Sequence, residues 1–233
     1  MRAAATVIAL AAALAVGVPS GRAADECNGL LVCIPVAGPW VVIPAPEAAS
    51  ETAEWRLLCP EGVVGGVDAR ASERAVAVEF PGRIGSPVNP GITTADSLLF
   101  RGTYAGRARR ATSYRPFIGC IPGGGGGRRT PTAVVAAAPA VKPGEPVTLR
   151  VATLRIRVGT LARKTLSCLS GERLLGASHS IGLFTRGVPS PADLGAVRVV
   201  SVTRGRQILV SATRRGLAPG VRAQVQIRAE CAR

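Results

Sequence analysis

The chain has 233 residues, a formal net charge of +15 at pH 7, and only 3% aromatic residues. Its single histidine and the lack of any C-x-x-C pair argue against a zinc site, because structural zinc takes four closely spaced cysteine or histidine ligands. The 28 glycines and 18 prolines break the chain into short runs rich in valine and threonine, a pattern typical of an all-β protein.

The first 23 residues have the three parts of a secretory signal peptide. Met1-Arg2 supplies a positive charge, an apolar run follows from Ala3 to Val18, and Gly21-Arg22-Ala23 places small residues before a cut after Ala23. The run is shorter than the ~20 residues that cross a bilayer, which disfavours a membrane anchor. We expect a secreted or otherwise extracytoplasmic mature protein without a transmembrane segment.

A cysteine–glycine motif occurs twice. Cys59-Pro60-Glu61-Gly62 leads into Val-Val-Gly-Gly, and Cys168-Leu169-Ser170-Gly171 leads, two residues later, into Leu-Leu-Gly-Ala. Another cysteine follows each copy at a similar distance: Cys120 lies 61 residues after the first cysteine and Cys231 lies 63 residues after the second. Such self-similarity indicates one supersecondary unit that is used twice.

All six cysteines follow the predicted signal peptide, and an even number in an oxidising compartment indicates three disulfides. Six cysteines allow 15 pairings, and equivalence of the two halves narrows them to one. Closing a loop of about 60 residues would stabilise each half by roughly 4 kcal/mol in the chain-entropy treatment. The predicted pairs are Cys27–Cys33, Cys59–Cys120 and Cys168–Cys231.

Five consecutive glycines at 123–127 predict a flexible linker. A phosphate-cradling loop would need a preceding strand, a following helix and a Lys-Ser/Thr pair, none of which the sequence offers. We therefore predict an all-β chain with two tandem small disulfide-bridged β-sandwich-like domains after the signal peptide. Their bounds are 24–122 and 141–233, with the linker at 123–140.

Several strands are predicted from runs of apolar or alternating residues. In the first half they are 40–43, 55–59, 74–80, 97–104 and 117–120. In the second half, a strand at 147–158 changes phase near Ala152-Thr153, which predicts a bulge or a strand that changes sheets. Residues 198–210 predict a hairpin that turns at Arg204-Gly205. The last strand alternates most cleanly, with Cys231 on its inner face. Its predicted inner residues are Val221, Ala223, Val225, Ile227, Ala229 and Cys231.

The segment Lys142–Leu149, a Pro-Gly turn before Val-Thr-Leu, resembles the start of an early strand in bacterial immunoglobulin-like domains. The second half departs from that family because it has no tryptophan to pack on its disulfide and its second cysteine lies in the last strand. As a whole, the chain resembles uncharacterised exported proteins of high-GC bacteria, which are rich in Ala, Arg and Gly and carry Cys-x-x-Gly…Gly-Gly motifs. That resemblance implies an extracytoplasmic role and no particular activity.

The positive charge is concentrated in the second half. Residues 24–127 contain 9 Arg against 10 Asp and Glu, whereas residues 128–233 contain 18 Lys and Arg against 4 acids. This imbalance predicts a polyanionic partner such as a cell-envelope polymer or an acidic glycan, because arginine binds phosphate and carboxylate bidentately. High-GC coding together with polar outward strand positions is the alternative explanation. The candidate contacts are Arg155, Arg157, Arg204, Arg206, Arg214 and Arg215.

Specific nucleic-acid binding is disfavoured, because Phe184 is the only aromatic residue of the second half on which a base could stack. The two tryptophans and two tyrosines of the first half would form a sugar-binding platform if exposed and a core if buried, and the scarcity of aromatics favours the core. They are Trp40, Trp55, Tyr104 and Tyr114.

Signals of catalysis are weak. His179 lies between two serines, but no G-x-S-x-G motif is present and neighbours on a strand point to opposite faces. We predict a non-enzymatic binding or structural protein of the cell envelope, with no metal or cofactor. The alternatives are a small extracellular hydrolase and a protein-interaction module that uses a sheet edge. Candidate glycosidase carboxylates are Asp68, Glu73, Glu79 and Asp96.

Overall fold

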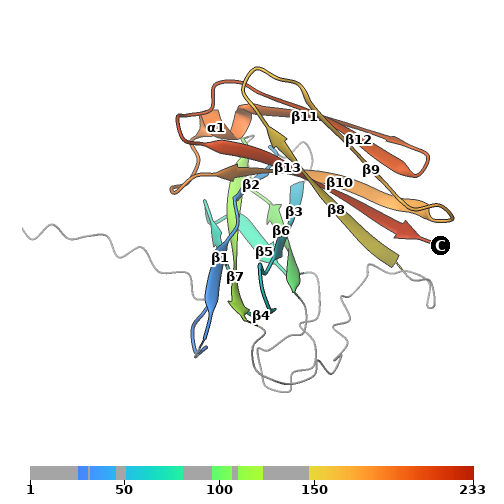
Figure 1. Cartoon of the computed structure of the whole chain (residues 1–233). Coiled ribbons are helices and arrows are strands. Elements are labelled where there is room, and N and C mark those ends of the chain that lie inside the picture. The colour runs from blue at the N-terminus through green and yellow to red at the C-terminus, as the bar shows by residue number, and fades with distance from the viewer. Residues whose placement is uncertain (1–25, 31, 46–50, 81–95, 107–109, 123–146) are drawn as a thin grey trace, which may run out of the picture.

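A computed structural model of the protein describes residues 26–30, 32–45, 51–80, 96–106, 110–122 and 147–233. The predicted signal peptide and the predicted linker lie outside these residues. Within them the chain forms β-strands and one short helix (Figure 1). The predicted all-β class is confirmed.

The first-half strands are β1 (Ile34–Ala37), β2 (Trp40–Ile43), β3 (Glu51–Leu58), β4 (Val63–Ala71), β5 (Val76–Glu79), β6 (Ser97–Tyr104) and β7 (Thr112–Ile121). The second-half strands are β8 (Val147–Ile156), β9 (Ala162–Ser167), β10 (Arg173–Phe184), β11 (Val197–Arg204), β12 (Gln207–Arg214) and β13 (Arg222–Ala232). Helix α1 (Pro191–Gly195) lies between β10 and β11.

The two halves repeat one arrangement of strands. In the first half, β3, β6 and β5 form a small sheet, and β7 pairs with β4 on one edge and with β1 and β2 on the other. In the second half, β9, β12 and β11 form the small sheet, and β13 pairs with β10 and β8. Strand β8 therefore takes the place of β1 and β2 together. The predicted sandwich-like arrangement is confirmed.

The repeated motif builds the same turn and the same β-bulge in both halves. Its glycines, Gly62 and Gly171, both adopt φ of 80°, a conformation that side chains disfavour. The strand that follows each glycine then shifts register once, which bends it locally. These shifts lie between Val64 and Gly66 in β4 and between Leu174 and Gly176 in β10.

The predicted disulfides all form, as Cys27–Cys33, Cys59–Cys120 and Cys168–Cys231. Each long bridge starts at the residue that follows β3 or β9, the first strand of a small sheet. It ends on β7 or β13, the strand that lies between two partners in the large sheet. The bridge therefore ties the two layers of its half together.

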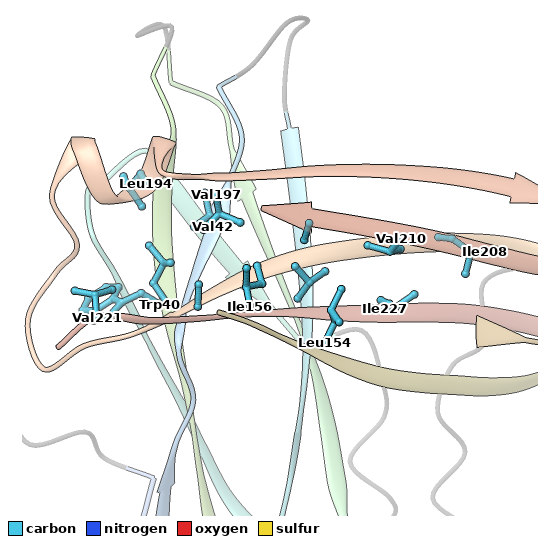
Figure 2. Packing of buried hydrophobic residues seen from close by; sticks show 14 residues of the cluster. Trp40, Val42, Leu154, Ile156, Leu194, Val197, Ile208, Val210, Val221 and Ile227 are labelled. Atoms are coloured by element: carbon cyan, nitrogen blue, oxygen red, sulfur yellow. The ribbon is translucent and has the colours of Figure 1, made fainter. Parts of the chain in front are cut away.

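The halves join edge to edge. Residues 40–42 of β2 pair antiparallel with residues 181–183 of β10, which merges the two larger sheets into one of seven strands. Alternate residues of β2 enter different cores, because Val41 and Ile43 pack in the first half whereas Trp40 and Val42 pack in the second (Figure 2). The two small sheets therefore cover opposite faces of the shared sheet.

Side chains of the second half also cover the free edge of β3. The Gln226 Oε1 accepts a hydrogen bond from the Arg56 N–H at 2.7 Å, and its Nε2 donates to the Arg56 carbonyl at 3.0 Å. The Ser180 Oγ accepts from the Glu54 N–H at 3.1 Å, and Arg228 forms an ion pair with the Glu54 carboxylate. These bonds satisfy backbone groups that would otherwise be left without partners.

Two sequence-based expectations concern the faces of the last strand and the boundary between the halves. The inner face of the last strand is confirmed, since its six predicted residues are at most 9% exposed. Its other face does not simply face solvent, because Gln226 is buried under β3. The domain boundaries stay a prediction. The halves are joined by the pairing of β2 with β10 in one sheet, whereas the sequence predicted only a flexible linker between them.

The bulge predicted at Ala152-Thr153 is wrong. Strand β8 pairs with β13 in unbroken register from Val147 to Ile156. The phase of the apolar residues changes because Arg150 occupies an inward position, opposite the buried Ala229, and reaches Glu172 at 2.9 Å. A charged side chain with a partner thus replaces the apolar residue that the alternation required.

Candidate functional site

The small sheets of the two halves can be matched position by position. The Cys59 N–H donates to the Asp96 carbonyl at 2.7 Å, just before β6, and the Cys168 N–H donates to the Arg206 carbonyl at 2.9 Å, just before β12. β3 therefore lies beside β6 in the register that β9 has with β12. Differences between their outer faces come from side chains rather than from the backbone.

The outer face of the first small sheet carries charges of both signs. Arg101 on β6 forms an ion pair with Glu54 on β3 at 2.7 Å and lies opposite Glu79 on β5. Glu54 also binds Arg228 from the second half. Arg101 is therefore compensated by carboxylates, whereas Arg56 on the same face of β3 donates to the Ser97 hydroxyl at 2.6 Å.

At the matching positions the second small sheet has no carboxylate. Arg163 on β9 lies opposite Ser211 on β12, which lies opposite Val200 on β11. Side chains alternate along β11, so every second residue joins this outer face. We call it the arginine face. It consists of the exposed residues Arg163, Arg198, Val200, Val202, Arg204 and Leu209.

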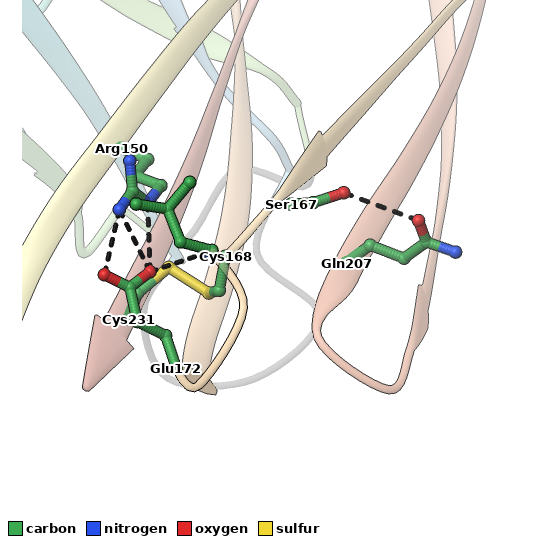
Figure 3. The surroundings of a disulfide bond; sticks show 7 residues. Arg150, Ser167, Cys168, Glu172, Gln207 and Cys231 are labelled. Carbon is green, nitrogen blue, oxygen red and sulfur yellow. Dashed lines mark hydrogen bonds and ion pairs between the residues drawn. A yellow bond between two sulfur atoms is a disulfide. The ribbon is translucent and has the colours of Figure 1, made fainter. Parts of the chain in front are cut away.

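The described carboxylates of the second half are all engaged elsewhere. Glu172 forms an ion pair with Arg150 at 2.9 Å beside the Cys168–Cys231 bridge (Figure 3). Glu230 pairs with Arg228 at 2.8 Å. Asp193 is buried in the first turn of α1, where it is held by backbone and side-chain hydrogen bonds. None of the three compensates the arginine face.

Two of these acids have lowered pKa values that reflect their partners. The hydrogen bond from Arg150 lowers the pKa of Glu172, and the Leu169 N–H adds to the effect. The Ala218 N–H, followed by the Ser190 hydroxyl, lowers the pKa of Asp193. Both groups therefore stay ionised and bound at neutral pH.

One of the predicted arginines, Arg204, belongs to the arginine face, and another, Arg206, lies beside it. Arg204 ends β11 and Arg206 lies in the two-residue turn that follows, so both project from the hairpin at one end of the face. The sequence analysis missed Arg163 and Arg198. Arg163 lies on β9, which the sequence analysis does not predict as a strand. Arg198 alternates with Val200 and Val202 along the sequence, and this pattern indicates that the three share one face of a strand.

The other four predicted arginines lie elsewhere. Arg214 is seven residues along β12 from the hairpin, about 24 Å away, and its Nη1 donates to the Val221 carbonyl at 3.3 Å. Arg215 follows it at the end of that strand. Arg155 is exposed on β8, in the other sheet, and Arg157 lies just beyond the end of that strand. The six do not gather into one patch.

His179 does not meet its neighbouring serine. It lies opposite Ile227 on the inward face of β10, whereas the Ser180 hydroxyl binds the Glu54 N–H on the other face. Burial lowers the pKa of the imidazole. Within the described part of the chain, no hydrogen bond to its ring is found, so the geometry of a Ser–His pair is not formed between His179 and Ser180.

The two tryptophans and two tyrosines of the first half are core residues. Their exposed fractions are 1% for Trp40, 4% for Trp55, 1% for Tyr104 and 0% for Tyr114. The Tyr114 hydroxyl lies 3.1 Å from the carbonyls of Ala53 and Phe100, and burial raises its pKa. These rings are not available to stack on a sugar.

The candidate glycosidase carboxylates come from four separate segments. Asp68 lies on β4, Glu73 follows that strand, Glu79 ends β5, and Asp96 precedes β6. Glu73 forms an ion pair with Arg110 at 3.2 Å. No element brings two of them to adjacent positions.

One group of potential metal ligands occurs among the described residues, namely Cys168, Glu172 and Cys231. The two sulfur atoms are bonded to each other as a disulfide, and both carboxylate oxygens of Glu172 accept hydrogen bonds from Arg150 (Figure 3). The group is therefore a disulfide next to an ion pair rather than a ligand set.

Among the described residues, no helix has the length and apolar character needed to cross a bilayer. Comparison with known protein families, curated proteins and solved structures finds no match for this chain. Its function therefore has to be inferred from its own residues.

Proposed function

We propose that this protein is a secreted or envelope-associated, non-enzymatic binding protein that adheres to anionic polymers through the arginine face. One observation carries the proposal. Two small sheets with matching backbones differ on their outer faces, where Glu54 and Glu79 of the first correspond to Arg163 and Val200 of the second. The second small sheet therefore has an arginine and a valine at the two positions where the first has carboxylates.

The spacing of the arginines suits an extended ligand. Arg198 and Arg204 lie six residues apart on β11, about 20 Å at the rise of a strand. Charges separated by more than about 8 Å are largely screened from one another at physiological salt. These arginines therefore repel each other weakly, while each can bind a separate phosphate or carboxylate of a polymer.

The apolar residues between the arginines add to this match. Val200 is 52% exposed, Val202 42% and Leu209 40%. Val202 and Leu209 are cross-strand partners, so they form an apolar centre with arginines around it. A glycan chain offers both anionic groups and apolar ring faces. We therefore take an acidic glycan or wall polymer as the ligand.

An extracytoplasmic location agrees with this ligand. The three disulfides use all six cysteines and leave none free, and disulfides persist in oxidising compartments. The predicted signal peptide ending at Ala23 would deliver the chain there. The resemblance to exported proteins of high-GC bacteria points to the same compartment.

The test is retention of the full chain on immobilised heparin, used as a model acidic glycan, with elution by a sodium chloride gradient. The triple variant R163Q/R198Q/R204Q removes three charges from the arginine face. The matched control, R155Q/R157Q/R215Q, removes three exposed arginines from other surfaces. We expect the first variant to elute at clearly lower salt than the wild type and the control to elute close to it.

Equal losses in the two variants would contradict the proposal, because retention would then follow net charge alone. A wild-type chain that fails to bind at low salt would contradict it as well. Circular dichroism of each variant checks that the fold is retained. All six substituted side chains are exposed, so we expect changes in stability within about 0.5 kcal/mol.

A further inference from the structure

A surface pocket of about 610 Å³ opens where the two halves meet. Three arginines line it from separate elements: Arg115 from β7, Arg186 from the segment after β10, and Arg222 from the start of β13. No carboxylate is among its lining residues. The rest of the wall is formed by Phe184, Thr185, Pro219 and Gly220.

Arg115 is a partly buried cation whose protein partners are all neutral. Its Nε donates to the Gly38 carbonyl at 3.0 Å, and its Nη1 lies 3.5 Å from the Thr185 carbonyl and 3.3 Å from the Arg186 carbonyl. Burial, together with the nearby Arg70, lowers its pKa. A cation taken from water without a counter-charge costs free energy, which a bound anion would recover.

The other two arginines are free to face a ligand. The Arg222 guanidinium lies over the Phe184 ring at 5.8 Å from its centroid, a stacking contact that leaves the N–H groups at its rim available. Arg186 is exposed, and among the described residues no ion pair engages its side chain. The pocket thus has one partly buried guanidinium held by the backbone and two that can close on an anion.

We propose that this pocket binds a phosphate monoester of about the size of a sugar phosphate. A phosphate monoester carries about −1.5 to −2 charges at pH 7 and three strong acceptor oxygens, which matches three guanidinium groups better than a carboxylate with one charge. The pocket is larger than a lone phosphate needs and falls in the range of sites for small organic ligands. The Thr185–Arg186 and Pro219–Gly220 walls would hold the organic part.

This inference goes beyond the proposed function, because it rests on other residues. None of the three pocket arginines belongs to the arginine face, and the pocket draws on both halves whereas that face belongs to the second half alone. Each site can therefore fail without the other.

The experiment is a titration of the full chain with glucose 6-phosphate, followed by thermal shift and by isothermal calorimetry at constant ionic strength. Glucose and glucuronate serve as the neutral and carboxylate counterparts. We expect saturable stabilisation by the phosphate, with binding at least tenfold weaker for glucuronate and none for glucose.

The variants R186Q and R222Q, and the two combined, test the site without touching Arg115, whose bonds to three carbonyls are structural. We expect at least a tenfold loss of affinity in the double variant, while R163Q/R198Q/R204Q binds glucose 6-phosphate like the wild type. The melting temperature of each variant without ligand checks its fold, and chemical-shift changes near Phe184 in the wild type locate the ligand independently.

Three results would overturn the proposal. The first is the absence of a saturable response in the wild type. The second is unchanged affinity in a folded double variant, and the third is equal binding of glucuronate, which would make the pocket a carboxylate site. Loss of heparin retention in the arginine-face variant has no bearing on these outcomes.

Discussion

The two small sheets share a backbone arrangement and differ in what their outer faces present. In the first, Arg101 forms an ion pair with Glu54 and lies opposite Glu79, so its charge is neutralised within the protein. In the second, the row contains Arg163, Ser211 and Val200, and nothing there neutralises the arginine. The two halves therefore share one scaffold, while a few outward residues set the charge that each face presents to a partner.

A second contrast concerns the edge strands of the two halves. Strand β2 presents Trp40 and Val42 to the core of the second half. Val41 of β2 lies opposite Tyr114 of β7, and Leu154 of β8 lies opposite Val225 at the matching position of β13, so Val41 and Leu154 correspond. Trp40 and Val42 therefore correspond to Thr153 and Arg155 of β8. One half thus offers an apolar edge that the other half covers, whereas the matching edge of the second half carries polar residues.

The largest expected effect comes from breaking the apolar edge. Trp40→Ala should cost about 3–5 kcal/mol in the free energy of unfolding, because it empties a fully buried site in the core of the second half. Urea unfolding measures this cost. The matched control is Thr153→Ala on β8, for which we expect a change within about 0.5 kcal/mol. Similar costs for the two variants would mean that the edges are not distinct.

A smaller effect is expected where the halves touch at a glycine. A Cβ added at Gly182 would lie 2.6 Å from both the Trp55 ring and Pro39, whereas one added at Gly176 on the same strand would come no closer than 3.5 Å to Glu230. Gly182→Ala should therefore destabilise the protein by about 1–3 kcal/mol through overpacking.

The control Gly176→Ala should change the free energy of unfolding by less than Gly182→Ala, because its added methyl group has room. Both variants are compared by urea unfolding under the same conditions. If Gly182→Ala were as stable as the wild type, the close packing of Trp55 on β10 would be refuted.

Much of the fold could be predicted because its signals are local. The spacing of the cysteines indicated the disulfides, and strict alternation indicated the faces of β13. The shared sheet is not predicted, because four apolar residues at 40–43 indicate only a strand, although an unbroken apolar run is typical of strands buried on both faces. Helix α1 was missed too, although Ser190 and Asp193 form a capping box that the sequence shows.

The candidate site was harder to predict than the fold. Which arginines share a face depends on the pairing of β9 with β12, and that pairing is set by residues far apart in the chain. Net charge points to the second half but not to a particular surface of it. Arg155 and Arg214 illustrate the limit, since both carry the expected charge and lie away from the arginine face.

The smallest expected effect is a pH dependence that involves His179, the chain's single histidine. Burial lowers its pKa in the folded state, so the unfolded chain, with an ordinary pKa of about 6.5, takes up the proton first as the pH falls. Its contribution to stability is therefore complete above about pH 6.5 and is lost as the pH falls below it.

Urea unfolding of the wild type and of His179→Gln between pH 7.5 and 5.5 isolates this contribution. We expect the wild type to lose stability relative to the variant as the pH falls through this window. Parallel curves would show that the imidazole titrates alike in the folded and unfolded states. The lowered pKa values of Glu172 and Asp193 act in the same direction at more acidic pH.

The salt dependence of binding tests the central claim, that the arginine face binds a polyanion, most directly. Each arginine that contacts a dense polyanion releases counterions and adds slightly less than one to the slope of log affinity against log salt concentration. For heparin, we predict that R163Q/R198Q/R204Q makes this slope shallower, reducing its magnitude by about 2–3 relative to the wild type. The control R155Q/R157Q/R215Q should leave the slope nearly unchanged. Equal slopes for all three proteins would contradict the account.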